Sequence, residues 1–174
     1  MPVPVEVTLS WDDIEEAAKK GVERNVNAHR SARDPRFIPR TDEEQWRGNI
    51  RGIIGEMVIC RWFSWPFNPE VTKPDTHIGD VGKLQVRMWW KPELYVYKRD
   101  WDDHPICLVT GTLPLNGANP VYFVHGWRYV HEIRAIGVPK HDPGSGSFIG
   151  HYLHARDLHD PRSLYQQRDQ LRTD

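Results

Sequence analysis

Two stretches near the start of the chain carry the residue pattern of helices. Ser10, followed three residues later by Asp13, is a helix-start signature, and residues 11 to about 27 then form a polar, amphipathic pattern. Residues 31–41 contain two prolines and are expected to form a loop. The first helix is therefore predicted to cover a core.

A second helix is predicted to begin at Thr41, which repeats the same signature with Glu44. The segment Ser64-Trp65-Pro66 ends it, because the residue before a proline avoids the helical conformation. Between these limits apolar residues recur at helical spacing: Trp46, Ile50, Ile53, Ile54, Met57 and Val58.

Beyond about residue 70 the pattern changes to extended segments. They hold Val, Ile, Leu and Tyr with turn residues between them, as expected for a sheet of hairpins. Short helices are predicted near 128–133 and 161–170, and 141–147 is a loop by composition. The predicted extended segments are about 76–80, 83–90, 93–98, 105–111, 120–126 and 147–154.

These elements predict an α/β (α+β) protein whose N-terminal helices pack on a mixed, largely antiparallel sheet. A chain of 174 residues fits one domain, 1–174. Its parts would be helices over about 10–63, a sheet core over about 70–155, and a polar C-terminal helix and tail over 160–174. With 8 Trp, 6 Tyr and 5 Phe, the core should be rich in aromatic residues.

Cys60 and Cys107 both lie inside apolar runs, which favours reduced core thiols in a cytosolic compartment. The N-terminus does not have the pattern of a signal sequence, and no stretch approaches the length of about 20 apolar residues that a membrane span needs. We therefore expect a cytoplasmic protein that does not interact with membranes.

Net charge does not by itself indicate a nucleic-acid binder, since the formal value is -1. The arginines, however, crowd the stretch from residue 24 to residue 51. Such a cluster could follow a phosphate backbone, although a solvated basic face fits it equally well. The candidate nucleic-acid contacts are Arg47, Arg51 and Lys83.

Glu56 interrupts a helix that is otherwise apolar, and an ionised carboxylate is costly there unless it has a partner. Asn49, Gly52 and Cys60 lie at helical offsets from it. Its face of the helix is therefore lined by small or polar residues that let another backbone approach.

A two-residue turn is predicted at Gly82-Lys83, because glycine at the first central position suits a type II′ hairpin. Asp80 would then face Gln85, and Arg87 would point to the same side by the strand period of two. By this parity Asp75 points away, which favours Asp80 over the literal Pro74-Asp75 pair. Three polar side chains are expected to converge on one patch.

The order of these motifs resembles the PD-(D/E)xK nuclease superfamily: a helix with GxxGE, then D-x-G, then a strand where E-x-K would stand. The longer string GIIGEM, GDVGKLQVR, LVTG and HGW is similar to small phage-encoded proteins. The resemblance covers roughly residues 45–160 and implies a restriction-endonuclease-like core. It also implies a DNA nuclease in the cytoplasm, or in the host cytoplasm if the protein is phage-encoded.

Carried over by position, the resemblance implies a site for Mg²⁺ or Mn²⁺. Asp80 would be the principal metal ligand, Gln85 the second ligand and Val86 the carbonyl donor. Glu56 would be the helix acid that supports the metal, and Arg87 would stand where the superfamily has lysine. The catalytic group would thus be Glu56, Asp80, Gln85 and Arg87.

The sequence departs from the superfamily pattern at two of these positions. Gln85 replaces an acid, although its neutral oxygen can still bind a hard cation. Arg87 replaces the lysine, and a guanidinium can hold a phosphate but cannot give up a proton. Fewer negative ligands should weaken Mg²⁺ binding and favour Mn²⁺.

Structural explanations stay open for each feature. Glu56 could pair with Arg87 as a structural ion pair, and Asp80 could be an ordinary hairpin residue. Aromatic residues in the predicted strands could stack on unpaired bases or simply fill the core: Trp89, Trp90, Tyr95 and Tyr97.

The sequence therefore predicts a metal-dependent nuclease with DNA as its partner. The alternative is a catalytically inactive protein of the same fold that binds DNA or another protein. A homo-oligomer is also left open.

Overall fold

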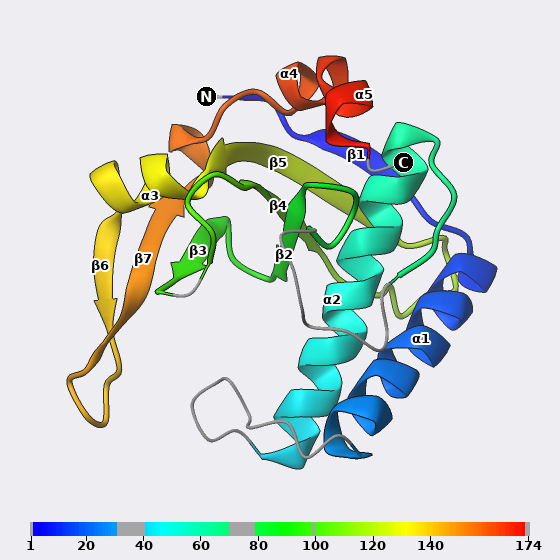
Figure 1. Cartoon of the computed structure of the whole chain (residues 1–174). Coiled ribbons are helices and arrows are strands. Elements are labelled where there is room, and N and C mark those ends of the chain that lie inside the picture. Colours follow the sequence, from blue (N-terminus) through cyan, green and yellow to red (C-terminus); the bar gives the residue numbers. More distant parts are fainter. Residues whose placement is uncertain (1, 31–40, 70–78, 99, 173–174) are drawn as a thin grey trace.

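The computed structural model describes residues 2–30, 41–69, 79–98 and 100–172 (Figure 1). Its helices are α1 (Trp11–Arg30), α2 (Asp42–Phe63), α3 (Val130–Ile136), α4 (Pro161–Gln166) and α5 (Arg168–Leu171), with a short 3-10 turn η1 (Ala155–Asp157). Its strands are β1 (Val5–Thr8), β2 (Gln85–Trp89), β3 (Glu93–Tyr97), β4 (Pro105–Gly111), β5 (Val121–Tyr129), β6 (Val138–His141) and β7 (Phe148–His154).

α2 begins and ends where the sequence predicts, and α1 begins at the predicted residue but continues to Arg30, beyond the expected end near residue 27. The Thr41 side chain accepts a hydrogen bond from the Glu44 backbone N–H and caps α2. Ser64 ends α2 in the left-handed conformation, with φ at 57°. Ser10 and Asp13 exchange hydrogen bonds at the start of α1. The loop expected at 31–41 lies almost wholly outside the described residues.

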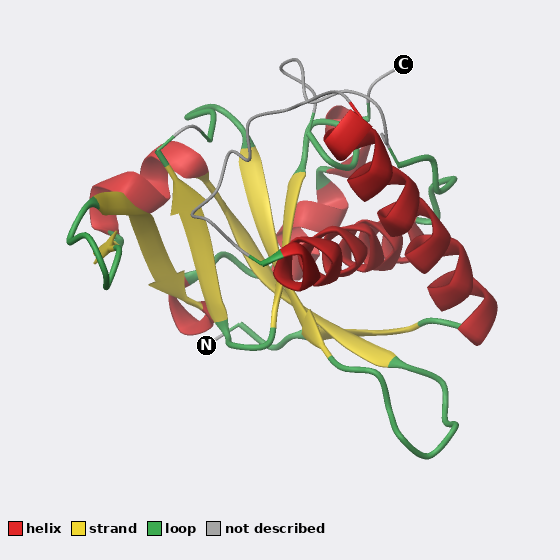
Figure 2. Cartoon of the chain, turned by 90° about the horizontal axis from the view of Figure 1, so that it is seen from below, coloured by secondary structure: helices red, strands yellow, loops and turns green. Residues whose placement is uncertain are grey.

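The strands form two sheets rather than one (Figure 2). The four-stranded sheet has the order β1-β5-β4-β2, and the three-stranded sheet has the order β3-β7-β6. Most neighbours are antiparallel, but β2 and β4 are parallel. The protein is thus an α+β structure with one mixed and one antiparallel sheet.

The single sheet of hairpins expected from the sequence is wrong in two respects. β3 does not pair with β2 but crosses to β7, because Leu94 and Val96 are buried in a second apolar cluster under α3. The short strands β1 and β6 were not expected. The extended segment at 76–80 falls mostly outside the described residues, and 79–80 are not in a strand.

β4 lies between two apolar clusters and links the two halves of the fold. Cys107 and Val109 face the larger cluster, which α1 and α2 cover, whereas Ile106 and Leu108 face the smaller one under α3. A strand that is buried on both faces has a continuous run of apolar residues, and residues 106–109 of β4 (ICLV) are such a run. Both cysteines are free and buried, as the sequence predicts.

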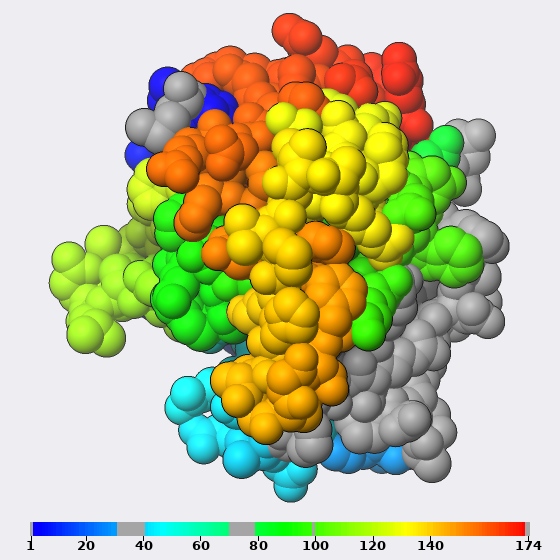
Figure 3. Space-filling view, turned by 90° about the vertical axis from the view of Figure 1, so that its left-hand side faces the viewer, coloured from blue at the N-terminus to red at the C-terminus, as the bar shows by residue number. Residues whose placement is uncertain are grey.

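The segment between β4 and β5 projects from the body of the protein (Figure 3). Leu115 in that segment is fully exposed. No helix in the described part of the chain has the length and apolar character needed to span a membrane.

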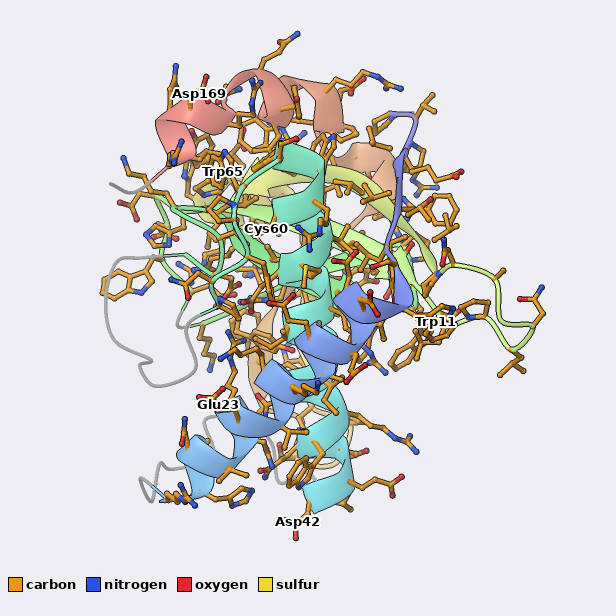
Figure 4. All side chains as sticks on the ribbon, turned by 90° about the vertical axis from the view of Figure 1, so that its right-hand side faces the viewer. Trp11, Glu23, Asp42, Cys60, Trp65 and Asp169 are labelled. Carbon is orange, nitrogen blue, oxygen red and sulfur yellow. The ribbon has the colours of Figure 1, made fainter. Side chains whose placement is uncertain are left out.

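α1 and α2 lie side by side (Figure 4). Their close contact depends on Gly21. A Cβ atom at this position would lie 2.6 Å from the Cα atom of Ile50, on the backbone of α2. Gly52 differs, because the nearest atom to a Cβ there is Arg24 Nη1 at 4.0 Å.

Gly21→Ala should therefore lower the free energy of unfolding by about 1–3 kcal/mol, since the added methyl group forces the helices apart. Gly52→Ala is the matched control and should cause no loss, because alanine favours a helix interior by up to about 1 kcal/mol over glycine. Urea unfolding of the two variants tests this contrast. Equal destabilisation by both would contradict it.

Candidate functional site

Glu56 is buried in α2 and forms a bidentate ion pair with Arg24 of α1. Its Oε1 and Oε2 atoms lie 2.7 and 3.0 Å from Nη1 and Nη2 of Arg24, and Glu56 is only 2% exposed. A carboxylate on an apolar helix was expected to need a partner, and that partner is Arg24. A structural ion pair between Glu56 and Arg87, the alternative expected from the sequence, is not found among the described residues, where Arg87 pairs with Asp80 and Asp100.

Small residues on α2 make this burial possible. Gly52 lies beside Arg24, and Asn49 donates a hydrogen bond to the buried Asn25 side chain at 2.7 Å. Gly55, next to Glu56, lets β2 approach, since a Cβ there would lie 3.0 Å from the Cβ of Met88. The helix thus holds Glu56 between α1 and β2.

The pKa of Glu56 is raised to about 8, chiefly by burial. The charge of Arg24 opposes this rise, the charge of Asp80 adds to it, and the charge of Arg87 opposes it. Asp80 and Arg87 are therefore close enough to Glu56 to act on its charge. Burial also raises the pKa of Cys60 to about 12, with Glu56 as a second cause, so this thiol stays protonated.

The predicted turn forms at Gly82-Lys83. Val81 and Leu84 exchange backbone hydrogen bonds of 3.0 Å, and Gly82 has a φ of 61° whereas Lys83 has no positive φ, as a type II′ turn requires. Beyond this bridge no ladder pairs Asp80 with Gln85 in the described residues. Instead, Asp80 Oδ2 accepts a hydrogen bond from the Val86 backbone N–H at 2.7 Å.

The guanidinium of Arg87 brings the other predicted site residues together. Its Nη1 lies 3.3 Å from the Val86 carbonyl oxygen and 3.7 Å from Asp80 Oδ2. Its Nη2 lies 3.3 Å from Gln85 Oε1 and 3.0 Å from Asp100 Oδ1. The three oxygens expected to bind a metal therefore all face one cation of the protein itself.

Asp100 and His104 belong to this group but were not among the predicted site residues. Asp100 is buried and also accepts the Tyr97 backbone N–H at 2.8 Å, and His104 Nδ1 lies 3.3 Å from Gln85 Nε2. Arg134 of α3 holds this segment by donating to the carbonyl oxygens of Tyr97, Lys98 and Asp100. In the sequence, Asp100 belongs to an acidic run with no periodicity that would mark it as buried.

Of the three candidate nucleic-acid contacts, only Arg51 lies in an aromatic environment near β2. Its guanidinium carbon lies 5.6 and 5.5 Å from the ring centroids of Trp89 and Trp90. Arg47 pairs with Glu43 along the exposed side of α2, and Lys83 lies at the turn, where its backbone N–H bonds Leu171. None of the interactions among the described residues joins Arg47 or Lys83 to the site.

Three carboxylates of the group face two guanidiniums. Glu56, Asp80 and Asp100 would contribute three negative charges when ionised, against two positive charges from Arg24 and Arg87, which leaves one net negative charge. No cluster of three or more His, Cys, Asp or Glu side chains suited to a metal occurs in the described ranges. Any metal would therefore rely on Asp80, Glu56 and neutral oxygens.

Comparison with family models, with curated proteins and with solved structures finds no match to this chain.

The raised pKa of Glu56 predicts how stability changes with pH. Because the folded protein holds a proton on Glu56 above its ordinary pKa of 4.5, the resulting stabilisation is present at low pH and is lost as the pH rises towards 8. The wild type should therefore lose unfolding free energy more steeply than Glu56→Gln between about pH 5 and pH 8. Chemical denaturation across this range measures the difference, and parallel curves would contradict it.

Proposed function

We propose that the protein is a divalent-metal-dependent DNA nuclease of the PD-(D/E)xK type, with a restriction-endonuclease-like core. One observation carries the proposal: the oxygens of Asp80, Gln85 and the Val86 carbonyl all face the Arg87 guanidinium, with Glu56 beside them. These residues come from a helix, a turn and the strand that follows it. Their order is the one on which the family resemblance rests.

The donor set fits a hard cation. All candidate ligands are oxygens, and Mg²⁺ prefers carboxylate and carbonyl oxygens. Asp80 Oδ2 is taken up by the Val86 N–H and by Arg87, whereas Oδ1 has no hydrogen bond within the described residues. The Asp80 side chain is 34% exposed. Once Glu56 is ionised the group carries one net negative charge, which adds to its attraction for a cation.

Arg87 sets the strength of this site. Its guanidinium already contacts the same oxygens, so a metal has to compete with a cation of the chain itself. Metal affinity is expected to be low for this reason, as well as for the lack of charge on Gln85. Once released from Val86 and Gln85, the two Nη groups of Arg87 can bind the phosphate oxygens of a DNA strand.

A bound metal ion would position water and stabilise the charge that develops on the phosphate during phosphodiester hydrolysis. Arg87 orients the phosphate and cannot serve as a base, because its guanidinium keeps its protons. His104 holds the Gln85 amide so that Oε1 points into the site. Glu56 must lose its proton to support a cation, so binding should strengthen as the pH rises towards 8.

Wild-type protein should bind Mn²⁺ more tightly than Mg²⁺, and Asp80→Ala should abolish both interactions, since the variant loses the principal anionic ligand. Titration calorimetry of each metal with wild type and variant measures this. Asp102→Ala is a matched control, because Asp102 is an exposed aspartate of the nearby loop that pairs with Arg134. Equal metal binding by wild type and Asp80→Ala would refute the assigned site.

A second candidate is a protein of the same fold that binds DNA or a protein partner without cleaving. It is favoured by the ion pairs themselves, because Arg24 and Arg87 neutralise the buried acids without any metal. The two candidates differ in what a second acidic ligand would do.

Gln85→Glu should raise Mg²⁺ affinity and produce nicking of plasmid DNA in Mg²⁺, since it adds an anionic ligand where Gln85 Oε1 now points. Agarose electrophoresis of the plasmid measures nicking. The double variant Gln85→Glu with Asp80→Ala is the control, because nicking that survives in it comes from a contaminating enzyme. Absence of both metal binding and nicking in Gln85→Glu would support the non-catalytic candidate.

A further inference from the structure

Aromatic rings form a continuous track that leads away from the candidate site. Trp89 and Trp90 stack with their ring centroids 3.8 Å apart, and Trp89 meets Tyr95 edge to face at 6.0 Å. Tyr95 in turn lies 5.7 Å from Tyr152. We call Trp89, Trp90, Tyr95 and Tyr152 the aromatic track.

The track lies on the same side of the strands as the candidate site. Trp89 follows Arg87 by two residues in β2, so both side chains point to one face. In the three-stranded sheet, Tyr95 is paired with Tyr152 in β3 and β7, while Leu94 pairs with Leu153 on the opposite face under α3. The tyrosines therefore do not belong to the apolar cluster that holds this sheet.

Trp89 packs against the apolar cluster under α3, but exposure distinguishes Trp90 from core packing, and nearby cations mark Trp90 and Tyr95. Trp90 is 55% exposed, although exposing so large an apolar ring is unfavourable. Arg51 lies over both tryptophan rings, and Lys140 Nζ lies 3.9 Å from the Tyr95 ring centroid. Glu93, an acid near Lys140, accepts a hydrogen bond from the Tyr95 hydroxyl. Flat rings flanked by cations suit a ligand that is both planar and anionic.

We infer that the aromatic track binds single-stranded DNA, with unpaired bases stacked on Trp90 and Tyr152 and phosphates near Arg51 and Lys140. This deepens the proposed function, on which it rests for its place beside the site, by naming an unpaired strand as the substrate class. The faces of bases in a duplex are already stacked on one another and cannot be covered by a protein ring. Base stacking on aromatic side chains tolerates any sequence, so no base preference is expected.

Binding can be measured without metal, so that cleavage plays no part. A fluorescein-labelled oligothymidylate and a duplex of matched length are titrated with full-length protein in EDTA, with fluorescence anisotropy as the readout. The wild type should bind the single strand at least about ten-fold more tightly than the duplex. Trp90→Ala should weaken single-strand binding by at least about five-fold, whereas Trp90→Phe should retain most of it.

Two controls match these changes. Trp11→Ala removes another exposed tryptophan, which lies at the start of α1 and donates to the Gly117 carbonyl oxygen (Figure 4); it should leave binding unchanged. Arg47→Gln removes a charge one turn before Arg51 on the same helix, and it should cost less affinity than Arg51→Gln. Crosslinking with an oligonucleotide that carries 5-iodouracil should give adducts at Trp90 or Tyr152.

Equal affinity of the wild type for single strand and duplex, or full binding by Trp90→Ala, would overturn the inference. Loss of metal binding and nicking with intact single-strand binding would instead refute the nuclease and retain the aromatic track as a binding surface. The two failures are therefore distinguishable.

Discussion

The buried carboxylate of Glu56 constrains everything around the candidate site. A charge on an apolar helix must be paired or protonated, and this one is paired with Arg24 while burial still raises its pKa to about 8. To meet this requirement α1 must lie against α2, and Gly21 allows it to do so. Breaking a buried ion pair by removing one partner typically costs about 3–5 kcal/mol.

Apolar residues of the same volume would often stabilise the fold as much as such an ion pair, or more. Its position is better understood through its neighbours, because Asp80 and Arg87 both act on the charge of Glu56. Arg87 links Asp80, Gln85, Val86 and Asp100 in turn. The site is thus one electrostatic network, and a change at any member alters the charge that the others experience.

The two proposals meet at β2. Arg87 and Trp89 lie on one face of this strand, so the group proposed to bind metal and phosphate continues directly into the aromatic track. β4 supports both, because its two buried faces join the cluster under α1 and α2 to the cluster under α3. Tyr97, two residues after Tyr95 in β3, has its ring centroid 5.9 Å from the Arg87 guanidinium, so this face of β3 lies beside the site.

The sequence by itself determined the features that depend on neighbours in the chain. The starts of α1 and α2 and the end of α2 followed from local capping and proline signals, and the turn at Gly82-Lys83 followed from glycine. That turn also brought Asp80 near Arg87, although Asp80 bonds the Val86 N–H and does not lie opposite Gln85. Only the tertiary structure decided which cation faces Glu56, that β3 leaves for a second sheet, and that Asp100 and His104 join the site. These outcomes join residues that lie far apart in the sequence, so periodicity and spacing carry no information about these contacts. Nothing in the local sequence singles out Arg24 among the several arginines as the partner of Glu56.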